Sequence, residues 1–271
     1  MSLNSSGSQI LSSIQYFHSA FLNREVTISV LLPAYYDPTH SYPLLLFNDG
    51  QDFEMLDIVA SLEKQLGNDP DKAFLVAGIH ADHDRIYEYG TAIQPDYAGR
   101  GNKAADTTKF VLHELLPFLK SHYNIKMTNM IYAGFSLGGL MALDMVWSHP
   151  EVFSAAGVFS GALWWRQKAL NEGYNDSDRI MHRQIEKAAA KPGLKFWFQC
   201  GSLDESDDRD GDGVIDSIQD TLECIAELER KGYVWNKDVF YLEVPDGYHN
   251  QETWSAVLPV FFEWVSASTL E

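Results

Sequence analysis

The fold is decided by residues 130–143, which read Met-Ile-Tyr-Ala-Gly-Phe-Ser-Leu-Gly-Gly-Leu-Met-Ala-Leu. An apolar strand leads into the motif Gly134-x-Ser136-x-Gly138, and an apolar helix follows it. A sharp turn of this kind between strand and helix puts the serine in a strained conformation with its Oγ exposed. Glycine is needed at both motif positions because a Cβ there would collide across the turn, and Gly139 lets the helix pack closely on the sheet. The stretch therefore predicts a nucleophilic serine.

Apolar segments alternate with helix-like segments on both sides of this motif. Strands are predicted over residues 14–18, 25–32, 44–47, 74–79, 130–133, 155–159, 196–199 and 239–244. The first two alternate in polarity, whereas the later ones are mostly continuous apolar runs, typical of strands buried on both faces. Helices are predicted over residues 103–121, 217–231 and 251–266, with Gly232 as a C-cap. The order predicts an α/β-hydrolase fold: a mostly parallel central sheet with an antiparallel pair at its start and helices on both faces.

The composition limits the class of protein. With 271 residues and 45% hydrophobic content, we expect a single domain over residues 1–271, with residues 1–10 flexible. A net charge of −18 argues against binding to nucleic acid or to anionic membrane surfaces. No run approaches the roughly 18 apolar residues needed to cross a bilayer. Two isolated cysteines and the lack of a signal-peptide pattern predict a cytoplasmic location. No feature predicts an oligomeric state.

A serine hydroxyl needs a general base, and this fold supplies it downstream in the chain order serine, acid, histidine. Among nine histidines, His249 lies between the last predicted strand and the last predicted helix, as that order requires. Asp204 and Glu205 are adjacent carboxylates after the strand 196–199. We expect Asp204 to accept the Nδ1–H of His249. Glu205 is the close alternative, and Asp246, which is less favoured because it is near His249 in sequence, also stays open.

Two backbone N–H groups are candidate donors to the oxyanion of the transition state. The N–H of Leu137 lies at the N-terminus of the helix after the serine, where it points to the developing charge. The loop after the strand 44–47 reads Asn-Asp-Gly-Gln-Asp over residues 48–52. Gly50 lets this backbone turn inwards, so the N–H of Gln51 is the second candidate donor. An ordinary Asx-type turn is compatible with that role.

Residues 80–103 and 161–177 are long irregular segments, and such loops in a compact domain are often functional. The candidate substrate-binding residues are Arg85 and Tyr89 in the first segment and Trp164 and Trp165 in the second. The two tryptophans offer a flat apolar surface for an acyl or aromatic group. Packing of one or both in the core is the alternative. The acidic and histidine residues of segment 80–84 have the wrong order for a metal site, and we expect them to shape the edge of the cleft.

An acidic segment follows the proposed triad acid. It matches the first nine positions of an EF-hand-like calcium loop, but position twelve is Gln219 instead of a bidentate glutamate. The candidate metal ligands are Asp208, Asp210, Asp212, the carbonyl of Val214 and Asp216. A structural calcium ion and a solvated acidic loop are both open interpretations of this pattern.

In combination, several motifs resemble the esterase family of α/β-hydrolases that includes enterochelin esterases, feruloyl esterases, esterase D and the mycolyltransferase antigens. They are the segments 49–51, 85–89, 114–117, 134–139, 160–165 and 247–249. The resemblance covers about residues 25–265, and it implies a carboxylic ester hydrolase with a Ser–acid–His triad and no required organic cofactor. The double tryptophan is most similar to the enterochelin-esterase branch, in which the corresponding loop lines the substrate cleft. The sequence shows no cluster of basic residues for an anionic catecholate substrate, which argues against siderophore hydrolysis.

These features predict a hydrolase of small-molecule esters. His249 deprotonates Ser136, the serine attacks the ester carbonyl, and water releases the acyl-enzyme. Acyl transfer to an alcohol or thiol would use the same residues, and capture of the acyl group by an added acceptor would distinguish it. A non-catalytic ligand-binding member of the fold is a second alternative, and the intact set of Ser136, Asp204 and His249 argues against it. A peptidase is a third, because the same triad can cleave amides, although no gating domain is recognisable.

Overall fold

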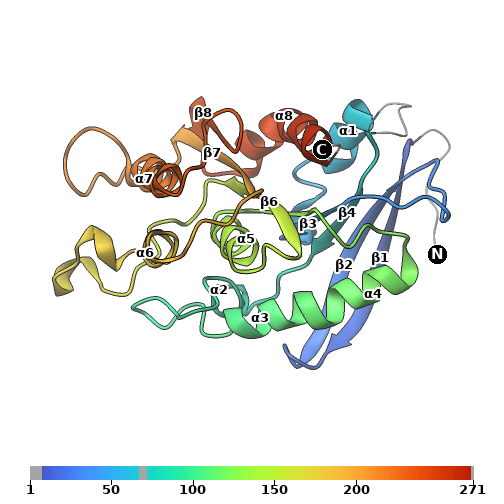
Figure 1. Cartoon of the computed structure of the whole chain (residues 1–271), viewed down its shortest axis with the longest axis horizontal. Helices are drawn as coiled ribbons and strands as arrows, with labels where there is room; N and C mark the ends of the chain where they lie inside the picture. The colour runs from blue at the N-terminus through green and yellow to red at the C-terminus, as the bar shows by residue number, and fades with distance from the viewer. Residues whose placement is uncertain (1–7, 67–71, 270–271) are drawn as a thin grey trace.

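The computed structural model describes residues 8–66 and 72–269, and eight strands in this part form one sheet (Figure 1). The strands are β1 (Ile10–Ser19), β2 (Arg24–Pro33), β3 (Leu44–Asn48), β4 (Leu75–Ile79), β5 (Met130–Phe135), β6 (Phe153–Phe159), β7 (Lys195–Leu203) and β8 (Val239–Tyr248). Their order in the sheet is β1-β2-β4-β3-β5-β6-β7-β8. The pairs β1–β2 and β2–β4 are antiparallel, and the other five are parallel. The predicted mostly parallel sheet with an antiparallel start is confirmed.

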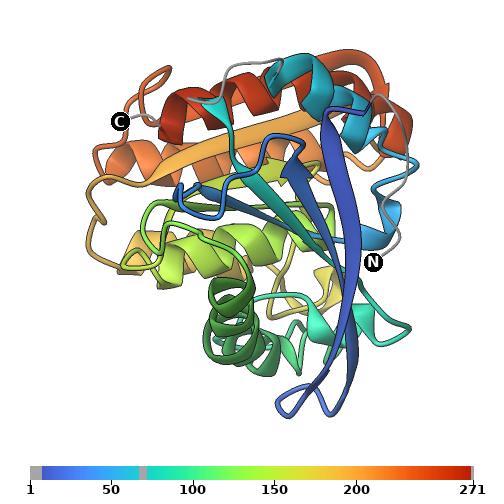
Figure 2. The ribbon, with the colours of Figure 1, turned by 90° about the vertical axis from the view of Figure 1, so that its right-hand side faces the viewer.

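Helices cover both faces of the sheet (Figures 1 and 2). One face packs against α1 (Ile58–Leu66) and α8 (Gln251–Thr269), and the opposite face packs against the remaining long helices. Those are α3 (Ala104–Phe110), α4 (Leu116–His122), α5 (Leu137–Ser148), α6 (Ile180–Lys187) and α7 (Asp216–Arg230). Successive side chains of a strand point to opposite faces, so a central strand must be apolar throughout. In β5, Met130 and Tyr132 join one core, while Ile131 and Ala133 join the other.

The predicted helix 103–121 is divided in the structure. A π-helical turn, η3 (Val111–Leu115), lies between α3 and α4. Pro117 follows at the start of α4, where its missing N–H and its ring are tolerated. The predicted helices 217–231 and 251–266 correspond to α7 and α8. The helices α1 and α6 lie in segments for which we made no specific prediction from the sequence.

The predicted flexibility of residues 1–10 is only partly open to comparison, because residues 1–7 lie outside the described residues. For residues 8–10 flexibility stays a prediction, although these residues have defined contacts. Ile10 begins β1 and is buried, and the backbone N–H of Gln9 donates to the Glu63 carboxylate over 2.9 Å. Ladder pairing with β2 and this contact with α1 hold the segment in place.

All six parallel strands end at the same edge of the sheet. Segments 161–177 (yellow) and 204–215 (orange) leave this edge and project on the same side of the molecule in Figure 1. Ligands of open α/β sheets bind in the crevice outside these carboxyl ends. In the part of the chain that the structure describes, no helix is long and apolar enough to pass through a bilayer.

Candidate active site

Ser136 lies on the turn between β5 and α5, in a strained backbone conformation. Its φ of 53° and ψ of −120° are unusual for a residue with a side chain. Its N–H donates to the carbonyl of Phe159 over 2.8 Å, and its carbonyl accepts the N–H of Ala162 over 3.1 Å. A Cβ on Gly134 would lie 2.4 Å from the carbonyl oxygen of Gly138, so only glycine fits this close approach. These contacts hold the turn in one conformation.

Four neighbouring parallel strands each place one polar side chain at the edge of the sheet where the parallel strands end. The residues that follow β5, β6, β7 and the end of β8 are, in that order, Ser136, Ser160, Asp204 and His249. Leu203 is paired with Tyr248 in the ladder between β7 and β8. The next residue of each strand, Asp204 and His249, therefore leaves the sheet beside the other.

Asp204 is 9% exposed, and burial raises the pKa of its carboxyl group. The Ser160 hydroxyl, the Gly201 backbone and the charge of His249 oppose this shift, although neither Oδ atom has a hydrogen bond of normal geometry. A Cβ on Gly201 would lie 2.3 Å from the Gly247 carbonyl oxygen and 2.8 Å from Oδ1 of Asp204. The carboxylate therefore occupies space that only a glycine leaves free.

His249 interacts with the charges of Asp204 and Arg85 and packs against the ring of Trp254. Desolvation of the imidazole lowers its pKa, the Asp204 charge raises it, and the Arg85 charge lowers it. The ring packs edge-on against Trp254 at 5.2 Å, and the Trp254 Nε1–H donates to Ser160 Oγ over 2.9 Å. In the described part of the chain no hydrogen bond joins His249 to Ser136 or Asp204. Such bonds are often long without substrate and tighten in the reacting complex.

The two alternative acids have other surroundings. Glu205 is half-buried, and burial raises the pKa of its carboxyl group, while the backbone of Ser217 at the start of α7 opposes the shift. Asp246 is exposed, and its N–H donates to Ser202 Oγ over 2.8 Å. Neither carboxylate contributes to the pKa shift of His249, to which Asp204 does contribute.

The loop after β3 lies directly against the turn of Ser136. The Asn48 side-chain amide donates to the Gly138 carbonyl over 2.8 Å. Asp49 has a φ of 63°, and the short helix η1 (Gly50–Asp52) follows it. The N–H groups of Leu137 and Gln51 belong to the first turns of α5 and η1, where N–H groups have no partner within their own helix. The two candidate oxyanion donors thus come from adjoining segments.

Arg85 and Tyr89 fix this loop. Arg85 forms two hydrogen bonds to the Asp49 carboxylate, Nε to Oδ1 over 2.7 Å and Nη2 to Oδ2 over 2.8 Å. Its guanidinium lies 5.0 Å from the ring centre of Tyr89, whose hydroxyl accepts the N–H of Asp49 over 3.3 Å. Tyr89 is only 1% exposed, so the prediction that it binds substrate is wrong. Both residues position the loop, and the guanidinium of Arg85 binds the Asp49 carboxylate through two of its N–H groups.

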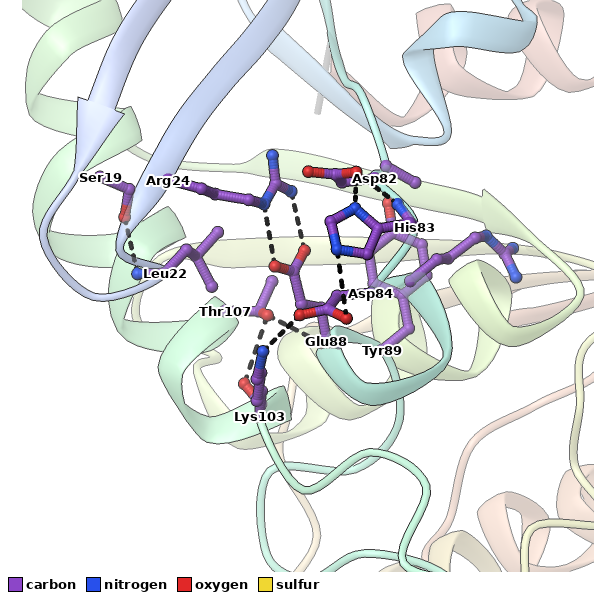
Figure 3. A network of polar contacts seen from close by, with 12 residues as sticks. Ser19, Leu22, Arg24, Asp82, His83, Asp84, Glu88, Tyr89, Lys103 and Thr107 are labelled. Carbon is purple, nitrogen blue, oxygen red and sulfur yellow. Dashed lines mark hydrogen bonds and ion pairs between the residues drawn. The ribbon is translucent and has the colours of Figure 1, made fainter.

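The segment that carries Arg85 is anchored at its other end by ion pairs (Figure 3). Arg24 of β2 binds the buried Glu88 with its Nε and Nη2 over 2.9 and 2.7 Å. Lys103 binds Asp84, and the Thr107 hydroxyl donates to the Glu88 carbonyl over 2.7 Å. These contacts connect α2 (Arg85–Glu88) to the β1–β2 hairpin and to α3.

The two tryptophans have different environments. Trp165 is 0% exposed, and a Cβ on Gly90 or Gly101 would meet its ring, so the prediction that it lines the cleft is wrong. Trp164 is half-buried, and the guanidinium of Arg100 lies 4.8 Å from its ring centre. One indole, not two, is available to a ligand.

Residues 19–264 match the model of the family described as "Putative esterase". The chain belongs to this esterase family. It is a carboxylic ester hydrolase, as the sequence motifs predict. The uncharacterized protein YjcH of Bacillus subtilis (strain 168) is similar to this esterase, with 25% identity over 247 residues that make up 89% of this chain and 92% of that protein.

Two solved structures share the fold of this esterase. A ferulic acid esterase superposes with a TM-score of 0.71 at 16% identity, over 97% of this chain and 99% of that one. The enterobactin esterase from Shigella flexneri superposes with a TM-score of 0.74 at 17% identity, over 99% of this chain and 62% of the longer enterobactin esterase chain. At these identities the likeness concerns the fold, and it confirms the predicted α/β-hydrolase architecture.

The acidic loop of the esterase brings three of the predicted metal ligands together. Carboxylate oxygens of Asp208, Asp210 and Asp212 lie within 4.8 Å of one another. Asp216 is not in this group, because its Oδ1 accepts the N–H of Arg209 over 2.9 Å and its Oδ2 lies 3.3 Å from Arg209 Nη1. The full set of five predicted ligands stays a prediction, with Asp216 paired to Arg209 in this structure. Calcium binding to the remaining carboxylates stays a prediction.

Titration of the esterase with calcium chloride in a calorimeter tests this prediction. We expect a heat of binding that saturates at one ion per chain, and an affinity roughly tenfold lower or worse in Asp210→Asn, because fewer carboxylates weaken such sites. Asp246→Asn, an exposed carboxylate outside the loop, is the control and should bind like the wild type. Absence of heat in the wild-type protein would show that the loop is only solvated.

Proposed function

We propose that this esterase cleaves its substrate through an acyl-enzyme on Ser136, with His249 as general base and Asp204 as the third member of the triad. The observation that supports this most strongly is the strained turn of Ser136 beside two strand ends that carry Asp204 and His249 next to each other. Strain of this kind persists where surrounding contacts over-determine it, and it is common at active sites.

The proposed reaction needs no group beyond the substrate, water and these side chains. His249 takes the proton of Ser136 Oγ as the oxygen attacks the ester carbonyl. The N–H groups of Leu137 and Gln51 stabilise the tetrahedral oxyanion. The alcohol leaves with the proton from the imidazolium. Water then attacks the acyl-enzyme, His249 takes the proton of the water and returns it to Ser136, and the carboxylic acid is released.

The charges around His249 suit a base that works near neutral pH. Arg85 and desolvation favour the neutral ring before the reaction, and neutral imidazole is the form that can accept a proton. Asp204 favours the charged ring and stabilises the imidazolium that forms during attack. Arg85 therefore supports the mechanism in two ways, by holding the Asp49 loop and by lowering the pKa of the base.

The dependence of kcat/KM on pH for p-nitrophenyl acetate tests this proposal. Because the pKa of His249 is lowered from its ordinary value of 6.5, the base stays neutral at pH 7 and gains a proton only at lower pH. We expect activity that is constant above neutrality and falls with a midpoint below pH 6.5. Asp204→Asn should move this midpoint lower still, since it removes a charge that raises the pKa. A midpoint above pH 7 would contradict the assignment of His249 as the base.

A further inference from the structure

Two arginines from separate loops meet around Trp164. The guanidinium carbons of Arg100 and Arg166 lie 4.8 and 5.7 Å from the Trp164 ring centre, and 5.3 and 5.2 Å from that of Tyr97. Arg166 also lies 5.7 Å from the ring centre of Tyr174. We refer to these five residues as the arginine–aromatic cluster. The sequence shows no basic run here, because the two arginines belong to different loops.

The two arginines differ in their partners. Arg100 is paired with the buried carboxylate of Asp96, with 2.6 Å from Nε to Oδ2. Arg166 has no carboxylate within ion-pair distance among the described residues. Its Nη1 makes one long bond of 3.4 Å to the Trp164 carbonyl, and its Nε is buried without a hydrogen-bond partner.

This lack of a partner is uncommon in the chain. Of its eight arginines, six pair with an aspartate or glutamate, namely Arg24, Arg85, Arg100, Arg179, Arg209 and Arg230. Among the described residues the other exception is Arg183, which donates to the Gln167 side-chain amide over 3.2 Å. In a chain with a net charge of −18, an arginine surrounded by aromatic rings and left without a carboxylate is set up to receive one from a ligand.

Part of the cluster lies on the loop after β6, which is hydrogen-bonded to the turn of the nucleophile. The Ala162 N–H binds the Ser136 carbonyl, and the Trp165 N–H binds the Ala162 carbonyl over 3.2 Å. Arg166 is the next residue, and its own carbonyl accepts the N–H of Tyr97 over 3.0 Å. Two backbone hydrogen bonds thus link the Ser136 turn to the residue before Arg166, on the side of the molecule where the parallel strands end (Figure 1).

We propose that Arg166 binds a carboxylate carried by the ester substrate. A guanidinium holds a carboxylate with two parallel hydrogen bonds, which fixes its orientation as well as its charge. The rings of Tyr97, Trp164 and Tyr174 limit the access of water, so the pair is stronger than an exposed ion pair. Tyr97 is 41% exposed and marks the open side of the cluster. This inference rests on the proposed serine mechanism and adds a substrate class to it.

The simpler role of Arg166 is packing against the aromatic rings. A cation–π contact at an exposed site contributes about 0.5–1 kcal/mol and does not depend on the substrate. Loss of such packing would change the hydrolysis of neutral and charged esters alike. Loss of a carboxylate site would change that of charged esters alone. The ratio of the two rates separates the roles.

The test compares two matched pairs of esters. The first pair is p-nitrophenyl butyrate and the p-nitrophenyl monoester of glutaric acid, which carries a carboxylate on its acyl side. The second pair is phenyl acetate and para-acetoxybenzoate, which carries it on the alcohol side. In one pair, we expect Arg166→Gln to lower kcat/KM of the charged ester about 10- to 100-fold and to leave the neutral ester within about twofold. The pair that responds identifies the side of the ester on which the carboxylate lies.

Two further variants make the result specific. Arg166→Lys keeps the charge but not the fork, so it should recover part of the lost rate. Arg183→Gln removes the other arginine that has no carboxylate partner, a half-buried residue of α6, and should leave all four rates unchanged. Equal effects of Arg166→Gln on both members of both pairs, or no effect on any ester, would overturn the proposal. Either outcome leaves the serine mechanism intact, because that mechanism is measured on the neutral esters.

Discussion

Ser136→Ala is expected to lower kcat for p-nitrophenyl acetate by about 10³-fold or more. The substitution removes only the Oγ atom that attacks the carbonyl. The backbone contacts that hold the turn, from the Ser136 N–H to Phe159 and from its carbonyl to Ala162, stay in place. Without the nucleophile, the oxyanion donors and the base can at most assist the direct attack of water, and triads reduced in this way retain only a small residual rate.

The control for this experiment is Ser148→Ala at the opposite end of α5. Ser148 accepts a hydrogen bond from Gln184 and lies far from the strand edge that carries the nucleophile, so kcat should stay within about twofold. Thermal unfolding of both variants should resemble that of the wild type. Retention of wild-type kcat in Ser136→Ala would remove Ser136 from the mechanism, whatever the identity of the base.

Asp204→Asn is expected to lower kcat by about 10³- to 10⁴-fold, because the amide favours the wrong tautomer of His249 and cannot stabilise the imidazolium. Asp204 is the carboxylate whose charge raises the pKa of His249, and it leaves the sheet beside that histidine. The amide has almost the same volume, so the close packing of Asp204 against Gly201 is preserved.

Glu205→Gln is the matched control for this prediction. Glu205 is adjacent to Asp204 in sequence, and burial also raises the pKa of its carboxyl group. It interacts, however, with the backbone of Ser217 at the start of α7. We expect kcat to change less than about fivefold. If Glu205→Gln abolished activity and Asp204→Asn did not, the third triad member would be Glu205. The two single substitutions thus decide between Asp204 and Glu205.

The sequence predicted best what is encoded in short, contiguous patterns. Gly134, Ser136 and Gly138 stand in one motif, and the predicted turn between strand and helix is present with the expected strain. The positions of Asp204 and His249 followed from chain order in the fold, and the pairing of Leu203 with Tyr248 explains why they lie together. All eight predicted strands are present.

Features that depend on packing between distant segments were not predictable from the sequence. Trp164 and Trp165 are neighbours in the chain, yet only the fold of the segment around Gly90 and Gly101 determines which indole is covered. Tyr89 is buried because its hydroxyl reaches the Asp49 backbone. Asp216 fits a calcium-loop pattern, but Arg209 within the same loop takes its carboxylate. Arg100 and Arg166 belong to two different loops, and only the packing of these loops brings both guanidinium groups to Trp164.

The central claim is that Ser136 carries the acyl group, and mass spectrometry of the intact protein tests it most directly. A fluorophosphonate ester reacts with a serine only when an adjacent base activates it, and it forms a stable adduct. We expect one adduct per chain, located by proteolysis in the peptide that contains Ser136, and no adduct in Ser136→Ala. An adduct on another residue, or no adduct on a protein that hydrolyses p-nitrophenyl acetate, would contradict it.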